Sequence, residues 1–156
     1  MRRLSLLVLL AVAATACGGS KNASTTSTST AGSPAEFVSA GNKVCIAADR
    51  RIFKIGRLSR DPKGWARTAV AARTAVTEMK RIVPPPRRAA AFRLMIRYAN
   101  ALVLSIQEVH DSLVKSDLDT AAAAQFAAGK IQDKVHTAAK AVGLTFCQQP
   151  LTNWPA

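Results

Sequence analysis

The chain has 156 residues, 49% of them hydrophobic and 5% aromatic, and 22 Lys and Arg against 9 Asp and Glu give a net charge of +13. This length holds one domain with appendages and excludes the large two-domain enzyme folds. Charged residues make up an ordinary 20% of the chain, so the positive charge reflects a shortage of acids and does not predict disorder throughout.

Residues 1–16 have the pattern of an export signal. Two arginines precede an apolar stretch over residues 4–14, and the small residues Ala14-Thr15-Ala16 stand directly before Cys17. A transmembrane helix needs about 20 apolar residues, so this stretch is too short to span a membrane. The pattern predicts a secretory signal peptide.

Small residues before a cysteine at the end of such a signal resemble the bacterial lipobox. That resemblance implies that Cys17 receives diacylglycerol and becomes an N-terminus acylated, for example, with palmitate. Ala14 stands where the lipobox usually has leucine, and the same residues fit an ordinary signal-peptidase site, which would leave Cys17 a free thiol. Disulfides in an exported chain use cysteines in pairs, so one of the three cysteines has no disulfide partner. Lipidation of Cys17 accounts for that cysteine if Cys45 pairs with Cys147. We therefore expect an anchor to the outer face of the cell membrane, with release of an unanchored chain as the alternative.

Residues 17–33 continue this N-terminal region as a tether. They consist almost entirely of Gly, Ser, Thr, Ala and Asn after the cysteine. Such a composition buries too little apolar surface to offset the entropy of ordering, which predicts a flexible segment. Residues 34–156 then form the predicted domain and its C-terminal tail.

Four stretches with helical periodicity follow the tether, and no alternation long enough for a strand is present. The first opens with a capping box from Ser33 to Glu36 and is expected to run to about Leu58. The second opens at Asp61-Pro62 and is stopped by three prolines over residues 84–86.

The third predicted helix runs from about Arg87 to Lys115. The fourth begins at Ser116, with Asp119 completing a second capping box, and ends at Gly143. Four amphipathic helices with short connections predict an all-α, antiparallel up-down four-helix bundle. Much of the fourth apolar stripe is alanine, which buries little area, so a staple would add stability.

A disulfide between Cys45 and Cys147 would provide that staple. Cys45 lies on the first predicted helix, and Cys147 follows the fourth by four residues. The first and fourth helices are neighbours in the predicted topology. The bond would be structural, since a redox pair more often has the C-x-x-C spacing.

Residues for catalysis or metal binding are scarce. His110 and His136 would lie roughly 21 Å apart along an antiparallel helix pair, too far to share a metal ion. No Gly-rich phosphate loop, G-x-S-x-G elbow or H-E-x-x-H sequence is present. We therefore expect neither an enzyme nor a cofactor or metal site.

The positive charge is concentrated in one part of the chain. Residues 43–97 contain 15 Lys and Arg against Asp49, Asp61 and Glu78, a net charge of +12, whereas residues 98–156 contain four bases and five acids, a net charge of −1. The predicted basic surface consists of Lys43, Arg50, Lys54, Arg57, Arg67, Arg81, Arg87, Arg88, Arg93 and Arg97. Nucleic acid is the usual partner of such charge, but export argues against it. An anionic lipid, an envelope polymer or an envelope protein is the expected partner.

Three apolar residues fall outside the predicted core stripes. Ile46 and Phe53 lie on the basic side of the first helix, and Phe126 points away from the core stripe of the fourth. Two interpretations remain open for Ile46 and Phe53. The C-terminal tail covers them with one or more of its apolar residues, or they form an exposed patch for a lipid interface or a protein partner. The candidate covering residues are Leu144, Phe146, Leu151 and Trp154.

The overall pattern resembles a group of small helical lipoproteins of actinobacteria. The resemblance rests on the lipobox at Cys17, the Ser/Thr-rich tether, residues 42–51, the proline break after Val83 and residues 143–147. The resemblance implies a cellular location and a disulfide, and it implies no activity. Our leading hypothesis is a lipid-anchored binding or scaffolding module of the cell envelope, and the alternative is a small-ligand carrier with a cavity in the bundle.

Overall fold

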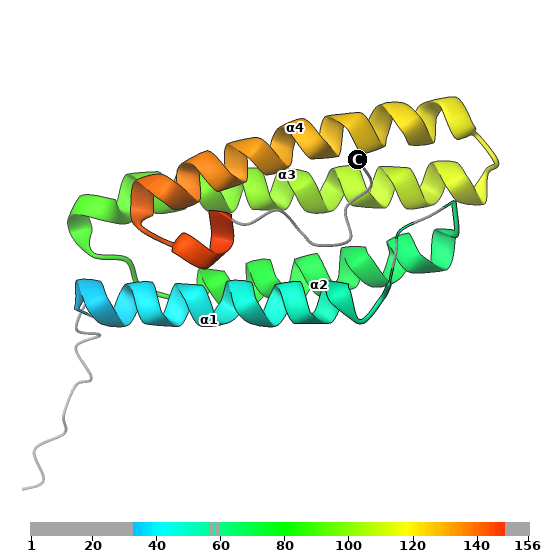
Figure 1. Ribbon diagram of the computed structural model, residues 1–156. Coiled ribbons are helices and arrows are strands. Elements are labelled where there is room, and N and C mark those ends of the chain that lie inside the picture. The colour runs from blue at the N-terminus through cyan, green and yellow to red at the C-terminus, as the bar shows by residue number, and fades with distance from the viewer. Residues whose placement is uncertain (1–32, 57, 59, 149–156) are drawn as a thin grey trace, which may run out of the picture. The chain divides into compact units, whose positions relative to one another are not determined.

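The computed structural model describes residues 33–56, 58 and 60–148, so the predicted signal peptide, Cys17, the tether up to residue 32 and the last eight residues lie outside it. Its described part is all-helical and contains no strand (Figure 1). The four α-helices are α1 (Pro34–Phe53), α2 (Pro62–Lys80), α3 (Ala89–Val114) and α4 (Leu118–Val142). Two short 3-10 helices, η1 (Pro86–Arg88) and η2 (Thr145–Gln148), precede α3 and follow α4.

Local capping chemistry accounts for most helix starts. The predicted capping box of α1 is confirmed, because Ser33 Oγ accepts from Glu36 N at 3.2 Å and Ser33 N donates to Glu36 Oε2 at 2.7 Å. Asp61 caps α2 by accepting from Lys63 N at 3.0 Å.

The helix ends show two departures from the prediction. Ser116 does not cap α4: it adopts a φ of 59° in the turn after α3, and Asp117 is the cap, accepting from Thr120 N at 3.0 Å. In addition, α1 ends at Phe53 and not near Leu58, and the turn that follows includes Gly56 at a φ of 85°. The predicted stop at Gly143 is confirmed by its left-handed φ of 81°.

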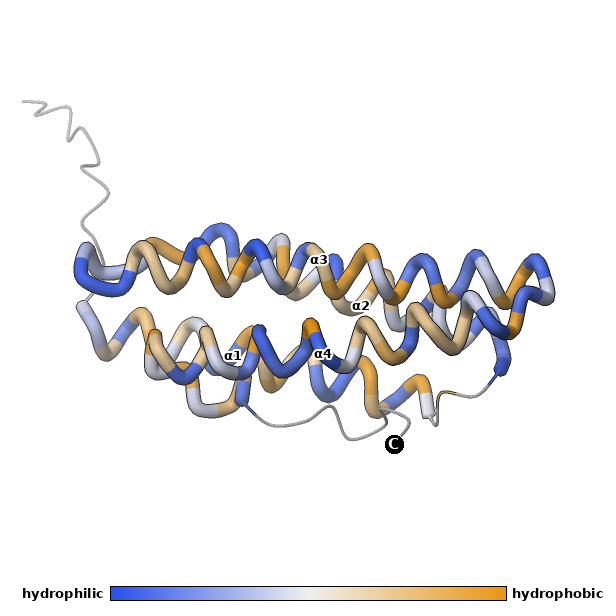
Figure 2. Tube along the Cα trace, turned by 90° about the horizontal axis from the view of Figure 1, so that it is seen from above, coloured by the Kyte–Doolittle hydropathy of each residue, from blue (hydrophilic) through white to orange (hydrophobic). Residues whose placement is uncertain are grey.

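The core lies between α3 and its neighbours. α3 packs on both α2 and α4, and Figure 2 shows hydrophobic residues recurring along it. One cluster is built around Phe37, Met79 and Phe92, and a second around Trp65 and Ile106. The segment Pro86–Val114 is long and apolar enough to cross a membrane by length and composition alone, a test that the core helix of a bundle also passes.

The first and fourth helices, which the sequence predicts to be neighbours, meet mainly through η2 and without substantial direct packing. Substantial packing joins α1 to α2, α2 to α3 and α3 to α4, while η2 packs on both α1 and α4. The residues after Gly143 turn back and stand between the two helices, so the α1–α4 corner is closed through η2. The Cys45–Cys147 disulfide is confirmed and crosses this corner, with 5.2 Å between the Cα atoms of residues 102 positions apart.

Candidate functional site

η2 is attached to α1 by several contacts besides the disulfide. Asn42 Oδ1 accepts from Phe146 N at 3.2 Å, and Asn42 Nδ2 donates to Thr145 Oγ1 at 3.4 Å. Leu144 is fully buried, and a methyl group added at Gly41 would lie 2.6 Å from its Cδ2 atom. A side chain at position 41 would crowd Leu144, the residue that precedes η2, so the glycine suits this close contact of the C-terminal residues with α1.

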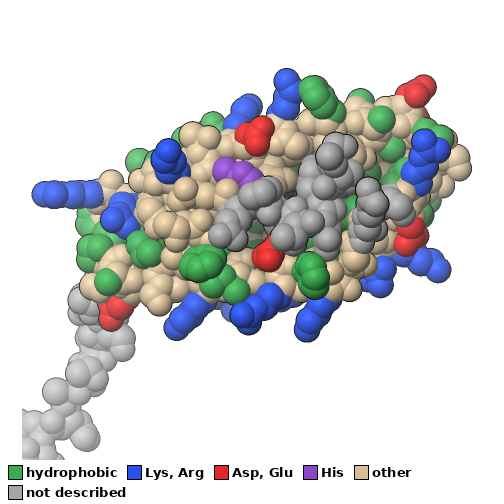
Figure 3. Space-filling model, in the orientation of Figure 1, with side chains coloured by type: hydrophobic (Ala, Val, Ile, Leu, Met, Phe, Trp, Pro, Cys, Tyr) green, Lys and Arg blue, Asp and Glu red, His purple; other side chains and the backbone are tan. Residues whose placement is uncertain are grey.

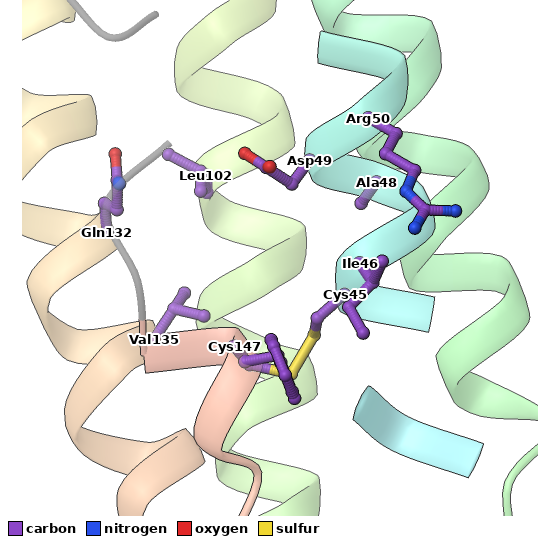
Figure 4. Close-up of a pocket in the computed structure, with 10 residues that line it drawn as sticks. Cys45, Ile46, Ala48, Asp49, Arg50, Leu102, Gln132, Val135 and Cys147 are labelled. Carbon is purple, nitrogen blue, oxygen red and sulfur yellow. A yellow bond between two sulfur atoms is a disulfide. The ribbon is translucent and has the colours of Figure 1, made fainter. Parts of the chain in front are cut away.

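A cavity of about 500 Å³ opens beside this attachment. Its walls come from α1, α3, α4 and η2, and Figure 4 shows the disulfide at one side, with Asp49 of α1 projecting toward Leu102 of α3. The lining residues are Cys45, Ile46, Ala48, Asp49, Arg50, Leu102, Gln132, Val135, Phe146 and Cys147. Residues of α1, α4 and η2 line the cavity together, an arrangement that helical periodicity does not encode.

Among the described residues that line this cavity, Gln132 carries a buried amide. Its side chain is 5% exposed, and its Oε1 atom has no hydrogen-bond partner among the described residues. Its Nε2 atom lies 3.5 Å from His136 Nε2. Burial lowers the pKa of His136, although Asp133 acts in the opposite direction, so the neutral ring can accept from the amide and leave Oε1 available to another donor.

Gln132 was missed by the sequence analysis, although a signal was present. It follows Ala128 by four residues and precedes Val135 by three, which places a polar residue in the apolar stripe of α4. A buried acceptor without a partner is costly, so a hydrogen-bond donor, which can be a water molecule, is expected beside Gln132 Oε1.

The three apolar residues that the sequence placed outside the core differ in exposure. Ile46 is half-buried and lines the cavity, whereas Phe53 is 62% exposed and Phe126 is 69% exposed. Lys130 Nζ lies 4.7 Å from the centre of the Phe126 ring.

The four candidate covering residues also differ. Leu144 does not cover Ile46 or Phe53, because it is fully buried in the core cluster with Phe37. Phe146 lines the cavity together with Ile46. Leu151 and Trp154 lie outside the described residues.

The basic surface is spread over α1, α2 and the start of α3. Lys43, Arg50 and Lys54, the C-cap that follows α1, are exposed and recur at steps of seven and four residues, so they share one face of the helix and its end. The exposed residues of α2 and α3, including their flanks, are Arg67, Arg81, Arg87, Arg93 and Arg97, and Arg57 is outside the described residues. Figure 3 shows Lys and Arg side chains projecting along the edge formed by α1.

Two arginines have structural partners. Arg88, predicted as part of the basic surface, donates from Nη1 to the Val142 carbonyl at 3.0 Å and satisfies the C-terminal end of α4. Arg51, which was not predicted, forms a two-pronged ion pair with Glu78 at 2.8 and 3.2 Å and joins α1 to α2. The hydrogen bonds from Arg51 are the main cause that lowers the pKa of Glu78.

The histidines lie apart from any group of metal ligands. His110 Nδ1 is 2.8 Å from Asp111 Oδ1 at the surface, and His136 lies beside Gln132. Within the described ranges, no three His, Cys, Asp or Glu side chains are placed to hold a metal ion.

Comparisons with known proteins do not assign this arrangement to a class. No known protein family matches the chain, and neither a curated protein nor a solved structure shows significant similarity to it.

Proposed function

We propose that this chain is an exported, lipid-anchored and non-enzymatic binding module of the cell envelope. The observation that carries the proposal is the exposed basic stripe of Lys43, Arg50 and Lys54 on α1, within a region of net charge +12 (15 Lys and Arg against three acids over residues 43–97). Charges held on one helix face can approach an anionic surface together. Each base near such a surface adds about 1 kcal/mol of attraction.

The proposal includes the location of the protein at the cell membrane and the topology of its helices. Cys17 carries the lipid after removal of residues 1–16, and the tether separates the domain from the membrane. The four helices form an up-down antiparallel bundle, which the packing of each helix on the next in the chain supports. The partner is the anionic headgroup layer or an acidic polymer of the envelope.

The test uses the exported chain with Cys17→Ser, so that binding does not depend on the lipid. Vesicles of phosphatidylcholine with and without phosphatidylglycerol are sedimented with the protein over a range of salt concentrations. The triple variant Lys43→Gln, Arg50→Gln, Lys54→Gln should lose roughly 100-fold in affinity. The matched control Lys130→Gln, Lys134→Gln, Lys140→Gln removes the same charge from α4 and should lose far less.

Two results would contradict the proposal. Equal losses in the two triple variants would mean that total charge, and not the α1 stripe, drives binding. Binding unchanged at about 0.5 M salt would exclude an electrostatic contact with headgroups, since screening is then nearly complete.

A small-ligand carrier is the second candidate, and the cavity of about 500 Å³ favours it. Pockets of this size accommodate small ligands in helical bundles. Organic extraction of the purified chain followed by mass spectrometry should release a bound apolar compound. A protein that yields none, and whose melting temperature no added apolar compound raises, is not such a carrier.

A further inference from the structure

We infer that the cavity beside η2 is a binding site for a neutral, mainly apolar small molecule that carries a hydrogen-bond donor, either a hydroxyl or an N–H group. The inference rests on the small-ligand carrier, the second candidate function above, and it names the chemical class of the ligand. Gln132 Oε1 is the atom that accepts the ligand's hydrogen bond.

The first step of the argument is that contacts within the protein hold the walls of the cavity together. The disulfide joins Cys45 of α1 to Cys147 of η2, and Asn42 Oδ1 accepts from Phe146 N at 3.2 Å beside it. The opposite walls come from α3 and α4, which pack on each other. The volume of about 500 Å³ lies in the range of roughly 300–1,000 Å³ that is usual for small-ligand sites. A preformed site of this size binds a ligand without paying for its own ordering.

The second step is the apolar character of those walls. Ile46 and Ala48 come from α1, Leu102 from α3, Val135 from α4 and Phe146 from η2. Figure 4 shows Val135 on the α4 side and Ile46 on the α1 side, with Leu102 between them. Transfer of apolar ligand surface from water to such walls is favourable, so most of the ligand should be apolar.

The third step is the single buried polar side chain, because it sets what the ligand must offer. Gln132 is 5% exposed, and its Oε1 atom has no hydrogen-bond partner among the described residues. Its Nε2 atom lies 3.5 Å from His136 Nε2, which leaves Oε1 for another donor. A hydroxyl or N–H group of a ligand can take the place of a water molecule there and keep the hydrogen bond. A ligand without a donor would displace the water and leave the acceptor bare, which is costly.

The fourth step is charge. Among the described residues that line the cavity, the charged ones are Asp49 and Arg50, whose charges of −1 and +1 cancel. Arg50 is exposed, and Figure 4 shows its side chain directed away from Leu102 and Gln132. An ionic ligand would lose its hydration against apolar walls of no net charge, so the site favours a neutral molecule.

The experiment measures binding of four naphthalene compounds to the full exported chain carrying Cys17→Ser, by equilibrium dialysis at pH 7. The compound 2-naphthol carries the donor, and 2-methylnaphthalene has a methyl group of similar size in its place. The anion 2-naphthoate and the cation 2-naphthylmethylammonium test charge. Gln132→Met removes the acceptor with little change in side-chain size. Gln125→Met is the matched control, because it makes the same change on α4 about two turns earlier, away from the described residues that line the cavity.

The measured quantity is the affinity for 2-naphthol divided by the affinity for 2-methylnaphthalene. Comparing this ratio between proteins cancels the difference in hydrophobicity of the two compounds. It should fall about tenfold in Gln132→Met and stay unchanged in Gln125→Met, because the hydrogen bond in the cavity is lost only in the first. Both charged compounds should bind at least about tenfold more weakly than 2-naphthol.

A second variant locates the binding and stays informative if Gln132→Met does not fold. Ala48→Phe places a large side chain in the α1 wall of the cavity and should weaken binding of both neutral compounds at least about tenfold, with the helical circular dichroism of the parent. Binding that Ala48→Phe leaves unchanged lies elsewhere on the protein and overturns the inference.

The remaining outcomes separate the inference from the functions proposed above. An equal affinity ratio in the parent and in Gln132→Met overturns the inference and leaves a carrier of apolar compounds that does not use the amide. Tighter binding of either charged compound than of 2-naphthol, abolished by Ala48→Phe, also overturns it. Binding of neither neutral compound overturns the inference and the carrier together. Vesicle binding, measured on the same proteins, tests the membrane proposal independently.

Discussion

The structure makes the disulfide the main connection between α1 and the C-terminal side of the bundle, and its removal is the clearest perturbation. α1 packs on α2 and on η2, with no substantial direct packing on α4. The bond joins residues 102 positions apart, and in the chain-entropy treatment closing a loop of that size contributes about 4–5 kcal/mol. For a domain of this size, the corresponding fall in melting temperature is about 10–20 °C.

The assay is urea and thermal unfolding, followed by circular dichroism, of the double variant Cys45→Ala, Cys147→Ala beside its parent. Cys17→Ser is the matched control, because that residue has no part in the bond, and it should leave stability unchanged. A loss below about 1 kcal/mol in the double variant would refute the reasoning, since the cross-link would then constrain little of the unfolded chain. The reduced parent should unfold like the double variant.

Three further predictions concern single contacts. In urea unfolding, Gly41→Ala should destabilise the domain by about 1 kcal/mol, because crowding of Leu144 outweighs the gain in helix propensity. Gly64→Ala is the matched comparison: its added methyl group would lie 3.6 Å from Leu58, an ordinary contact, so it should stabilise the domain by about 0.5–1 kcal/mol. Leu144→Ala should cost about 3–5 kcal/mol in the same assay, since the side chain is fully buried, and a cost below about 1 kcal/mol would mean that η2 is not seated against Gly41. Glu78→Gln should have a lower melting temperature than the parent at pH 7, because the lowered pKa of Glu78 gives stability that is present above its ordinary value of 4.5 and is lost as pH falls through the pKa of the folded state. The melting temperatures of the two proteins should therefore converge in acid, and a difference that persists there would contradict the ion-pair account.

Local signals predicted the helices well because each depends on a few neighbouring residues. Ser33 and Glu36 lie within one turn, and Gly143 needs only its own backbone to end α4. Ser116 was misassigned for the same reason: serine and aspartate both cap helices, and Asp117 takes the role because Ser116 adopts a left-handed backbone at the end of α3.

Contacts between distant residues were beyond such signals. The separation of α1 from α4 by η2 involves long-range contacts such as Leu144 against Gly41, two residues that are individually unremarkable in a turn and in a helix. The cavity, with Gln132 in its wall, is lined by these same elements. The disulfide between Cys45 and Cys147 could be predicted from the sequence, because the number of cysteines and the predicted export leave few possible pairings.

The same separation explains an anomaly in the composition of α1. Ile46 lies on the side of α1 that the sequence assigns to the basic surface, where a helix in a closed bundle would have no apolar contact to make. In the structure Ile46 faces the cavity, and Arg50 lines it while remaining exposed, so α1 has a core face, a cavity face and a basic face. Because α1 has these three faces, few of its residues are available to pack in the core, and only Phe37, Gly41 and Ile52 of α1 are buried. α1 is therefore the helix most dependent on Cys45 and on the Arg51–Glu78 pair, and loss of either should release it before the remaining three helices separate.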